Sequence, residues 1–147
     1  MIILDTNVLS ALMRDEPDPA VVTWLDTQPT ESVWTTAITV FEVRTGLELL
    51  DPSRRRQRLE SAFEQLLTRD LDDRVLAFDT TAADASGKLV ATGQRTGRSI
   101  EIRDAQIAGI SFARKATLAT RNVRHFEDLG VRLADPWAPT GRRTRRP

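Results

Sequence analysis

Short apolar runs alternate along the chain with longer segments in which apolar residues recur every three or four positions. The short runs predict β-strands, which we place at residues 2–4, 32–36, 75–79, 117–120 and, as a weaker fifth, 131–133. The longer segments carry an apolar stripe on one helical face and predict helices at residues 7–14, 19–27, 39–50, 53–69, 80–96 and 105–115. Strands that alternate with helices indicate a mostly parallel sheet with helices on its faces.

Ile2, Ile3 and Leu4 form an unbroken apolar run, which is typical of a strand buried on both faces of a parallel sheet. The predicted fold class is therefore α/β: a single-domain α/β/α sandwich with four to five strands. Asp18 followed by Pro19 predicts a capped helix start, since Pro suits the first helical position. Gly109 lies inside a predicted helix, where Gly costs about 1 kcal/mol relative to Ala unless it permits close packing.

The composition is that of a soluble globular domain. The 147 residues are 40% hydrophobic and 29% charged, and none is Cys. Without Cys, disulfides, thiol nucleophiles and Cys-type zinc sites are excluded. No apolar run approaches the ~18 residues of a membrane span, and no basic segment of the signal-peptide kind precedes the first strand. We therefore expect a cytoplasmic protein.

The net charge of zero is unevenly distributed. Residues 141–147 hold four of the 21 basic side chains and no acid, so residues 1–140 carry 17 basic against 21 acidic residues, a net charge of −4. We expect residues 138–147 to form a basic, flexible tail outside a domain that spans residues 1–137. A phosphate-contacting arm is the alternative interpretation of this tail.

The inventory of reactive side chains points to carboxylate chemistry. The chain has one His, His125, and no Tyr, and no Ser stands in a nucleophile-elbow motif. A lone His is more often a surface or capping residue than a catalyst. Catalysis, if present, is therefore expected to use carboxylates together with a metal ion.

Four polar residues follow strands or begin helices in the predicted layout: Asp5, Glu42, Asp104 and Asn122. In a parallel sheet, the strand ends and the starts of the following helices gather at one edge. Carboxylates brought together there would repel each other unless a cation lay between them. Hard cations such as Mg²⁺ or Mn²⁺ prefer oxygen ligands of this kind.

Each of these residues also has a purely structural interpretation. Asp5 is a suitable helix cap, and Asp104 precedes a predicted helix as an N-cap would. Residues 39–42 (TVFE) match a capping box in which Glu42 reaches back to the Thr39 amide. Asn122 is a common type of turn residue. From the residues alone, both interpretations remain open.

Five segments resemble PIN-domain ribonucleases in order and spacing. They are residues 3–10 (ILDTNVLS), 37–46 (AITVFEVRTG), 104–108 (DAQIA), 118–122 (LATRN) and 135–137 (DPW), the last resembling the FitB-like branch of the VapC toxins. The resemblance covers residues 1–137, implies a PIN-like sandwich and leaves the Arg-rich tail outside.

The resemblance implies a Mg²⁺- or Mn²⁺-dependent endoribonuclease, the toxin of a type II toxin–antitoxin pair. Asp5, Glu42 and Asp104 would be its metal-binding acids, and Thr6 and Thr120 would assist through their hydroxyls. Asn122 stands where many members have a fourth Asp, which puts a tightly held second metal ion in doubt. The implied partners are RNA, a VapB- or FitA-like antitoxin, and a second copy of the chain, in a heterotetramer or a larger complex with the antitoxin.

Two other functions remain alternatives. A non-catalytic PIN-like module would bind RNA or protein, and Asn122 is the feature in its favour. A phosphatase with an aspartyl nucleophile would need a second Asp two residues after Asp5, where this chain has Asn7.

The candidate phosphate contacts are Arg44, Arg54, Arg55, Arg56 and Arg121. Asp84 and Glu101 are further acids near the expected site.

Overall fold

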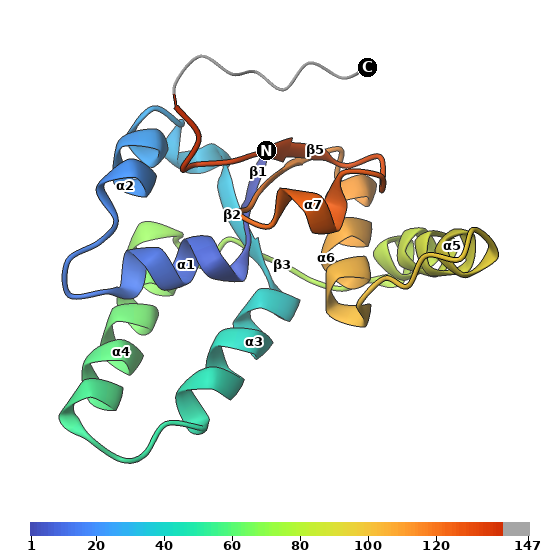
Figure 1. The fold of residues 1–147 in the computed structure, drawn as a ribbon. Coiled ribbons are helices and arrows are strands. Elements are labelled where there is room, and N and C mark those ends of the chain that lie inside the picture. Colours follow the sequence, from blue (N-terminus) through green and yellow to red (C-terminus); the bar gives the residue numbers. More distant parts are fainter. Residues whose placement is uncertain (140–147) are drawn as a thin grey trace.

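In the computed structural model, which describes residues 1–139, five parallel strands form one central sheet (Figure 1). The strands are β1 (Ile2–Leu4), β2 (Val33–Thr36), β3 (Val75–Leu76), β4 (Thr117–Ala119) and β5 (Arg132–Ala134). Their order is β3-β2-β1-β4-β5, with β1 in the centre. The register pairs Ile3 with Trp34 on one side and with Leu118 on the other. The predicted parallel α/β fold is confirmed.

Within residues 1–139, seven α-helices cover the sheet: α1 (Thr6–Met13), α2 (Pro19–Asp26), α3 (Ala37–Glu48), α4 (Arg54–Gln65), α5 (Thr80–Arg95), α6 (Ile102–Ala113) and α7 (Val123–Phe126). Two hydrophobic clusters lie on opposite faces of the sheet. Leu4 of β1 packs with residues of α1 to α4, whereas its neighbour Ile3 packs with α5, α6 and α7. Successive strand residues point to opposite faces, so this division makes the molecule a three-layer sandwich.

Several predicted boundaries were wrong for local reasons. Helix α3 begins at Ala37 rather than residue 39, because the Thr36 hydroxyl caps it by accepting from the Thr39 amide at 3.1 Å. Helix α6 begins at Ile102 rather than residue 105, because the Glu101 carboxylate caps it. Strand β3 has two residues where five were predicted, since it pairs only with Thr35 and Thr36 at the sheet edge. The short helix α7 was not predicted.

The second long helix also differs from its prediction. Helix α4 ends at Gln65 and continues as a π-helical turn, Leu66–Asp70, instead of running unbroken to residue 69. The Asp18 cap and Pro19 start of α2 are confirmed. Among the described residues, no helix is long and apolar enough to cross a membrane. The predicted tail lies almost wholly outside the described residues.

Gly109 allows α5 and α6 to pack closely. A Cβ built on Gly109 would clash with the Ser86 side chain and lie 2.7 Å from the carbonyl oxygen of Ala82, both on α5. The Ser86 hydroxyl is buried and donates to the Ala105 carbonyl at 2.9 Å. Close packing therefore accounts for a Gly at a position where Ala would be the better helix former.

We expect Gly109→Ala to lower the free energy of unfolding by about 1–3 kcal/mol, because the Ala82 backbone cannot move away easily. The melting temperature should fall by about 3–10 °C in thermal denaturation. Gly46→Ala on α3 is the matched control, since nothing lies within 4 Å of its Cβ, and it should raise stability by about 0.5–1 kcal/mol. Equal effects at both positions would contradict the packing explanation.

Candidate active site

Asp5 lies at the carboxyl end of the central strand, where β1 ends and α1 begins. Its amide continues the sheet by donating to the Ala119 carbonyl at 3.0 Å. Its Oδ1 accepts from the Thr6 amide at 2.8 Å and so caps α1. Its Oδ2 accepts from the Thr120 hydroxyl at 2.7 Å and from Nδ2 of Asn7 at 3.3 Å. Asp5 is therefore a helix cap, and it also presents a fixed carboxylate at the sheet edge.

The Asp5 carboxylate is only 5% exposed. Burial raises its pKa above the usual range, although the hydrogen bonds from Thr120, Thr6 and Asn7 act in the opposite direction. Desolvation therefore outweighs three hydrogen bonds at this carboxyl group. A buried carboxylate held by donors but lacking a counter-charge favours a cation as its partner.

Glu42 does not form the expected capping box. Because α3 begins at Ala37 and is capped by Thr36, Glu42 lies in the second helical turn, and the buried Thr39 hydroxyl accepts from Thr36 at 3.1 Å. Glu42 is half-buried, and its pKa is raised first by burial and then by the negative charge of Asp5. Its side chain is therefore free to line the cavity that also holds Asp5.

Asp104 is not the N-cap of α6 that the sequence suggested. Glu101 caps this helix by accepting from the Asp104 amide at 3.1 Å, which places Asp104 in the first turn with its carboxylate not used as the cap. Burial raises the pKa of Asp104, and the charges of Glu101 and Asp5 raise it further. Nδ1 of His125 lies 3.2 Å from its Oδ2.

The polar residues around β4 complete the arrangement. Thr120 is fully buried; its hydroxyl donates to Asp5 and accepts from the Asn122 amide at 3.0 Å. Asn122 is exposed, and its side chain makes no capping hydrogen bond to α7. The buried Oγ1 of Thr6 has no hydrogen-bond partner among residues 1–139, so it remains available to a ligand or water.

A cavity of about 410 Å³ brings these side chains together. Five of the six candidate residues line it: Asp5, Thr6, Glu42, Asp104 and Asn122. The sixth, Thr120, contacts the site through its hydrogen bond to Asp5. Chain segments separated by 37 and 62 residues thus supply three acids to one cavity, as expected for the carboxyl edge of a parallel sheet.

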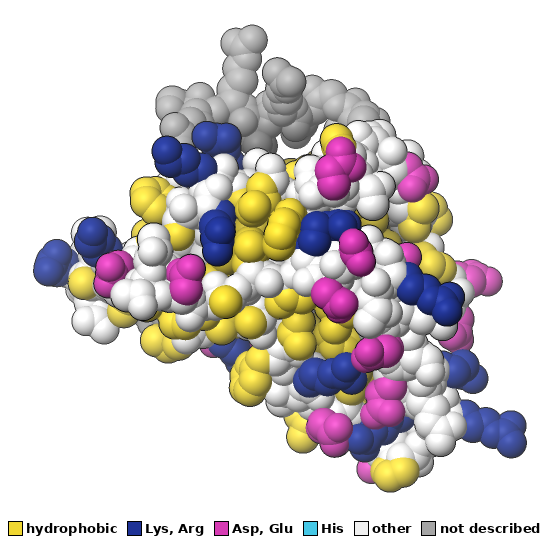
Figure 2. All heavy atoms as spheres, turned by 180° about the vertical axis from the view of Figure 1, so that it is seen from behind, with side chains coloured by type: hydrophobic (Ala, Val, Ile, Leu, Met, Phe, Trp, Pro, Cys, Tyr) yellow, Lys and Arg dark blue, Asp and Glu magenta, His cyan; other side chains and the backbone are white. Residues whose placement is uncertain are grey.

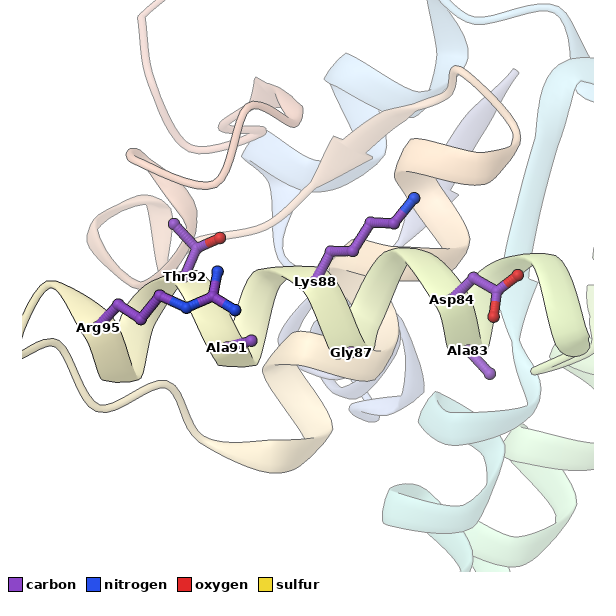
Figure 3. Close-up of a pocket in the computed structure, with 7 residues that line it drawn as sticks. All are labelled: Ala83, Asp84, Gly87, Lys88, Ala91, Thr92 and Arg95. Atoms are coloured by element: carbon purple, nitrogen blue, oxygen red, sulfur yellow. The ribbon is translucent and has the colours of Figure 1, made fainter.

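A hollow of about 510 Å³ lies along the outer side of α5 (Figure 3). All of its lining residues come from that one helix, and Asp84 is their one acid. Asp84 therefore lies apart from the carboxylate cavity. Glu101 serves as the cap of α6 and pairs with Arg103 at 3.2 Å.

Two features of the cavity fit a hard divalent cation. The pKa of Asp5 is raised by burial, whereas those of Glu42 and Asp104 are raised by burial and also by the negative charge of Asp5, and a cation would relieve that repulsion. Its donors are oxygen atoms, including the unpartnered Thr6 hydroxyl. Within the described part of the chain, no three of Asp, Glu, His and Cys are grouped as a ready-made metal site. The fit therefore rests on the oxygen donors and on the buried carboxylates, both of which suit a hard cation such as Mg²⁺.

Glu42 provides a pH-dependent prediction for the metal-free protein. Because folding raises its pKa, the folded state binds more protons than the unfolded state above the ordinary Glu pKa, so stability falls as the pH rises through that window. In a chelator, the melting temperature of the wild type minus that of Glu42→Gln should fall as the pH rises above the ordinary Glu pKa of about 4.3. Thermal denaturation at several pH values measures this difference; a constant difference would contradict the raised pKa.

Several residues that the sequence did not indicate also contact this site. Asn7 is the first residue of the helix predicted at residues 7–14, yet its Oδ1 accepts from the Arg121 amide at 3.0 Å and its Nδ2 donates to Asp5. His125 was interpreted as a surface residue, and it is exposed but contacts Asp104. Ser10, Arg14, Arg121 and Trp137 also line the cavity. Spacing alone gave no signal for these contacts, apart from the position of Asn7 two residues after the strand end.

Of the five candidate phosphate contacts, only Arg121 lines the cavity. Arg44 pairs with Glu64 at 3.0 Å, and Arg56 pairs with Glu48 at 2.9 Å and with Glu60 at 2.7 Å. Arg54 and Arg55 are exposed at the start of α4, outside the cavity. The crowding of arginines at this helix start is thus partly explained by structural ion pairs.

Comparison with known proteins identifies relatives that align with this chain over nearly its full length. The PIN domain family model matches residues 2–131. The plasmid stability protein StbB of Pseudomonas syringae pv. tomato is 39% identical over 137 residues, covering 93% of this chain and 99% of that protein. The VapC ribonuclease Y4jK of Sinorhizobium fredii is 38% identical over 139 residues, covering 95% and 99%.

A solved structure gives the same result at the level of the fold. The toxin FitB of Neisseria gonorrhoeae is 34% identical over 137 residues, covering 93% of this chain and 99% of that protein. The crystal structure of FitAcB from that organism superimposes with a TM-score of 0.84 over the same shares of both chains.

Proposed function

The chain belongs to the PIN-domain family, and from that premise we propose that it is a divalent-metal-dependent endoribonuclease, the toxin of a type II toxin–antitoxin pair. The observation that carries this proposal is the cavity in which Asp5, Glu42 and Asp104 meet. Full-length relatives named VapC ribonuclease and toxin FitB support it. Mg²⁺ or Mn²⁺ is the proposed cofactor, because both are hard cations that suit carboxylate and hydroxyl oxygens.

Asp5, Glu42 and Asp104 would hold the cation. When bound, it supplies Lewis acidity, which activates a water molecule for in-line attack on an RNA phosphodiester and offsets the negative charge that develops on the phosphate. Hydrogen bonds within the chain fix the orientation of the Asp5 carboxylate: the Thr6 amide donates to one of its oxygens and the Thr120 hydroxyl to the other. Asn122 adds a neutral oxygen in place of a fourth charge. No side-chain nucleophile is required.

Single-stranded or looped RNA is the proposed substrate. A flexible strand can bend into a cavity at the sheet edge, whereas an A-form duplex presents its phosphates on a stiff helix. The body of the chain is mildly acidic, so general attraction for RNA is weak and local contacts must supply it. The arginines that line the cavity, Arg14 and Arg121, are the local candidates.

A VapB- or FitA-like antitoxin and a second copy of the chain are the proposed partners, in the cytoplasm. The helices within residues 7–27 and 53–69 carry apolar residues that could serve either partner, but most of the large ones lie in the core. Apart from Met1, the exposed large hydrophobic residues lie on or directly after α3 and on α6: Phe41, Leu49, Ile102 and Phe112. Figure 2 shows a band of hydrophobic side chains across the middle of one face, with charged groups around it. Co-purification with the product of the neighbouring small open reading frame tests the antitoxin.

The proposed function is tested by RNA cleavage with Mg²⁺ or Mn²⁺. Asp104→Asn should reduce the rate by about 100-fold or more, because it removes one of three charges that hold the cation. Asp84→Asn is the matched control, since Asp84 lies in the hollow along α5, and it should cleave at the wild-type rate. Undiminished cleavage by Asp104→Asn would exclude the proposed site.

The same assay distinguishes the non-catalytic alternative. A wild-type protein that binds RNA but does not cleave it with either metal would support a PIN-like binding module. Asn122 favours that module, because it removes one charge from the set found in many family members. Three charged carboxylates in one cavity favour catalysis, since a binding surface for RNA phosphates gains nothing from buried negative charge.

A further inference from the structure

The carboxylate cavity also contains a basic and aromatic side that its catalytic role does not explain. Arg14, Arg121 and Trp137 line it together with the acids. The Arg121 guanidinium carbon lies 4.9 Å from the centre of the Trp137 ring, as in a cation–π contact. Within residues 1–139, no carboxylate lies in ion-pair distance of Arg121. Its guanidinium thus lies on an aromatic face without a direct carboxylate partner in that part of the chain, and its charge acts at longer range on Asp18, where it contributes to the lowered pKa.

Trp137 is itself fixed by two hydrogen bonds. Its indole N–H donates to Oδ2 of Asp18 at 2.8 Å, across 119 residues of sequence, and its amide donates to Oδ1 of Asp135 at 2.9 Å. The other oxygen of Asp18 accepts from the Ala20 amide at 3.0 Å and caps α2. The hydrogen bond from Trp137 is the main reason that the pKa of Asp18 is lowered, which is the direction expected when a donor stabilises the charged carboxylate.

The backbone of Arg121 is fixed relative to the catalytic acids as well. Its amide donates to Oδ1 of Asn7 at 3.0 Å, and the same Asn7 side chain donates to Oδ2 of Asp5 at 3.3 Å. The guanidinium rests on the indole of Trp137, which is anchored to α2 through Asp18. Both ends of the Arg121 side chain are therefore located with respect to the cavity before any ligand binds.

We propose that Arg121 binds a backbone phosphate of the RNA next to the phosphate being cleaved, and that Trp137 and Asp18 are positioning residues that hold it there. This inference rests on the proposed ribonuclease function. A guanidinium that stacks through its face keeps its N–H edge free for bidentate contact with phosphate oxygens. Because its position is fixed in advance, little side-chain freedom is lost on binding.

The other engaged arginines show why Arg121 is distinct. Arg44 also lies over an aromatic ring, that of Phe63, at 4.8 Å, but it pairs with Glu64 at 3.0 Å. Arg56 is shared between two glutamates and the Leu50 carbonyl. Those guanidiniums donate to groups of the protein itself, whereas Arg121 has no such partner among the described residues and lines the catalytic cavity.

The test measures binding of a fluorescein-labelled, 12-nucleotide, mixed-sequence single-stranded RNA by anisotropy. All variants are made in an Asp104→Asn background with Mg²⁺, so that the RNA stays intact, and KCl is varied. Arg121→Gln should weaken binding about tenfold, and the slope of log K against log salt should fall by about 0.7, the value for one phosphate on a single strand. Arg95→Gln on α5, outside the cavity, is the matched control and should change neither quantity.

The positioning role is tested by Asp18→Ser and Trp137→Phe. Serine keeps the cap of α2 but is too short to reach the indole, and Phe lacks the indole N–H. Each should weaken RNA binding about threefold when Arg121 is present and have no further effect in the Arg121→Gln background. A merely structural role would reduce binding equally in both backgrounds, which would overturn the positioning assignment. Melting temperatures confirm that each variant is folded.

The outcomes separate this inference from the proposed function. If wild type cleaves RNA and Arg121→Gln binds as tightly as its parent, the phosphate contact is wrong and the ribonuclease stands. If wild type neither binds nor cleaves any RNA, the proposed function fails, and the inference fails with it.

Discussion

Replacing Asp5 with Asn should abolish RNA cleavage, with a fall in rate of about 10³-fold or more. Asp5 lies at the centre of the sheet edge, is 5% exposed and contacts residues from both neighbouring segments, Thr6 and Thr120. The substitution removes the most deeply buried negative charge of the cavity while leaving its shape almost unchanged. The rate is measured with a labelled single-stranded RNA in Mg²⁺ or Mn²⁺.

The loss should not arise from unfolding. Asn can still accept from the Thr6 amide and cap α1, and it removes a carboxylate whose pKa is raised because burial disfavours its charge. We therefore expect the metal-free Asp5→Asn protein to melt at or above the wild-type temperature near pH 7. A variant that cleaves normally would exclude Asp5 as a ligand, and one that melts many degrees lower would show that its structural role dominates.

Removal of divalent metal ions should stop cleavage completely, and Mg²⁺ or Mn²⁺ should restore it. Three carboxylates with raised pKa values lie in one cavity; burial is the main cause for each, and the negative charge of Asp5 adds to it at Glu42 and Asp104, so a cation would stabilise their charged forms. EDTA followed by back-titration of each metal in the RNA assay measures the effect. Cleavage that survives EDTA would contradict a metal-dependent mechanism and point to general acid–base catalysis by the carboxylates.

Binding of the metal has a readout that does not depend on RNA. A ligand that binds only the folded state stabilises it by about 2.7 kcal/mol at 100 times its Kd, so Mg²⁺ or Mn²⁺ should raise the wild-type melting temperature by several degrees. Asp5→Asn and Asp104→Asn should show a much smaller rise, and Asp84→Asn should behave as wild type. A uniform rise in all four proteins would indicate a general salt effect.

Much of the fold was predictable because its signals are local. The unbroken apolar run of β1, the period of α5 and α6 and the Asp18–Pro19 start of α2 each depend on neighbouring residues, and each is present in the structure. The predicted starts of helices were wrong where two nearby residues could each serve as the N-cap. Thr36 caps α3 and Glu101 caps α6, which frees Glu42 and Asp104 from the structural roles that the sequence allowed them.

The contacts that complete the cavity had no local signal. The Asp18–Trp137 hydrogen bond joins residues 119 positions apart, and the Thr120–Asp5 bond joins residues 115 apart. The sequence places Asn7 at the start of a helix, and only the structure shows that its side chain connects Asp5 with the Arg121 backbone. His125 likewise gained its contact with Asp104 only because α7 packs against α6.

The sequence by itself determined the alternation of strands and helices, the reactive side chains available and, through five short segments, the family. Hydrophobic periodicity and side-chain chemistry are properties of the chain that do not depend on its folded form. Only the tertiary structure decided which acids are free, since a cap and a ligand differ by where a carboxylate points. It also decided that the Arg121 guanidinium lies at the cavity without an ion-pair partner among residues 1–139, because the contacts that hold it there come from residues that are distant in sequence and adjacent in space.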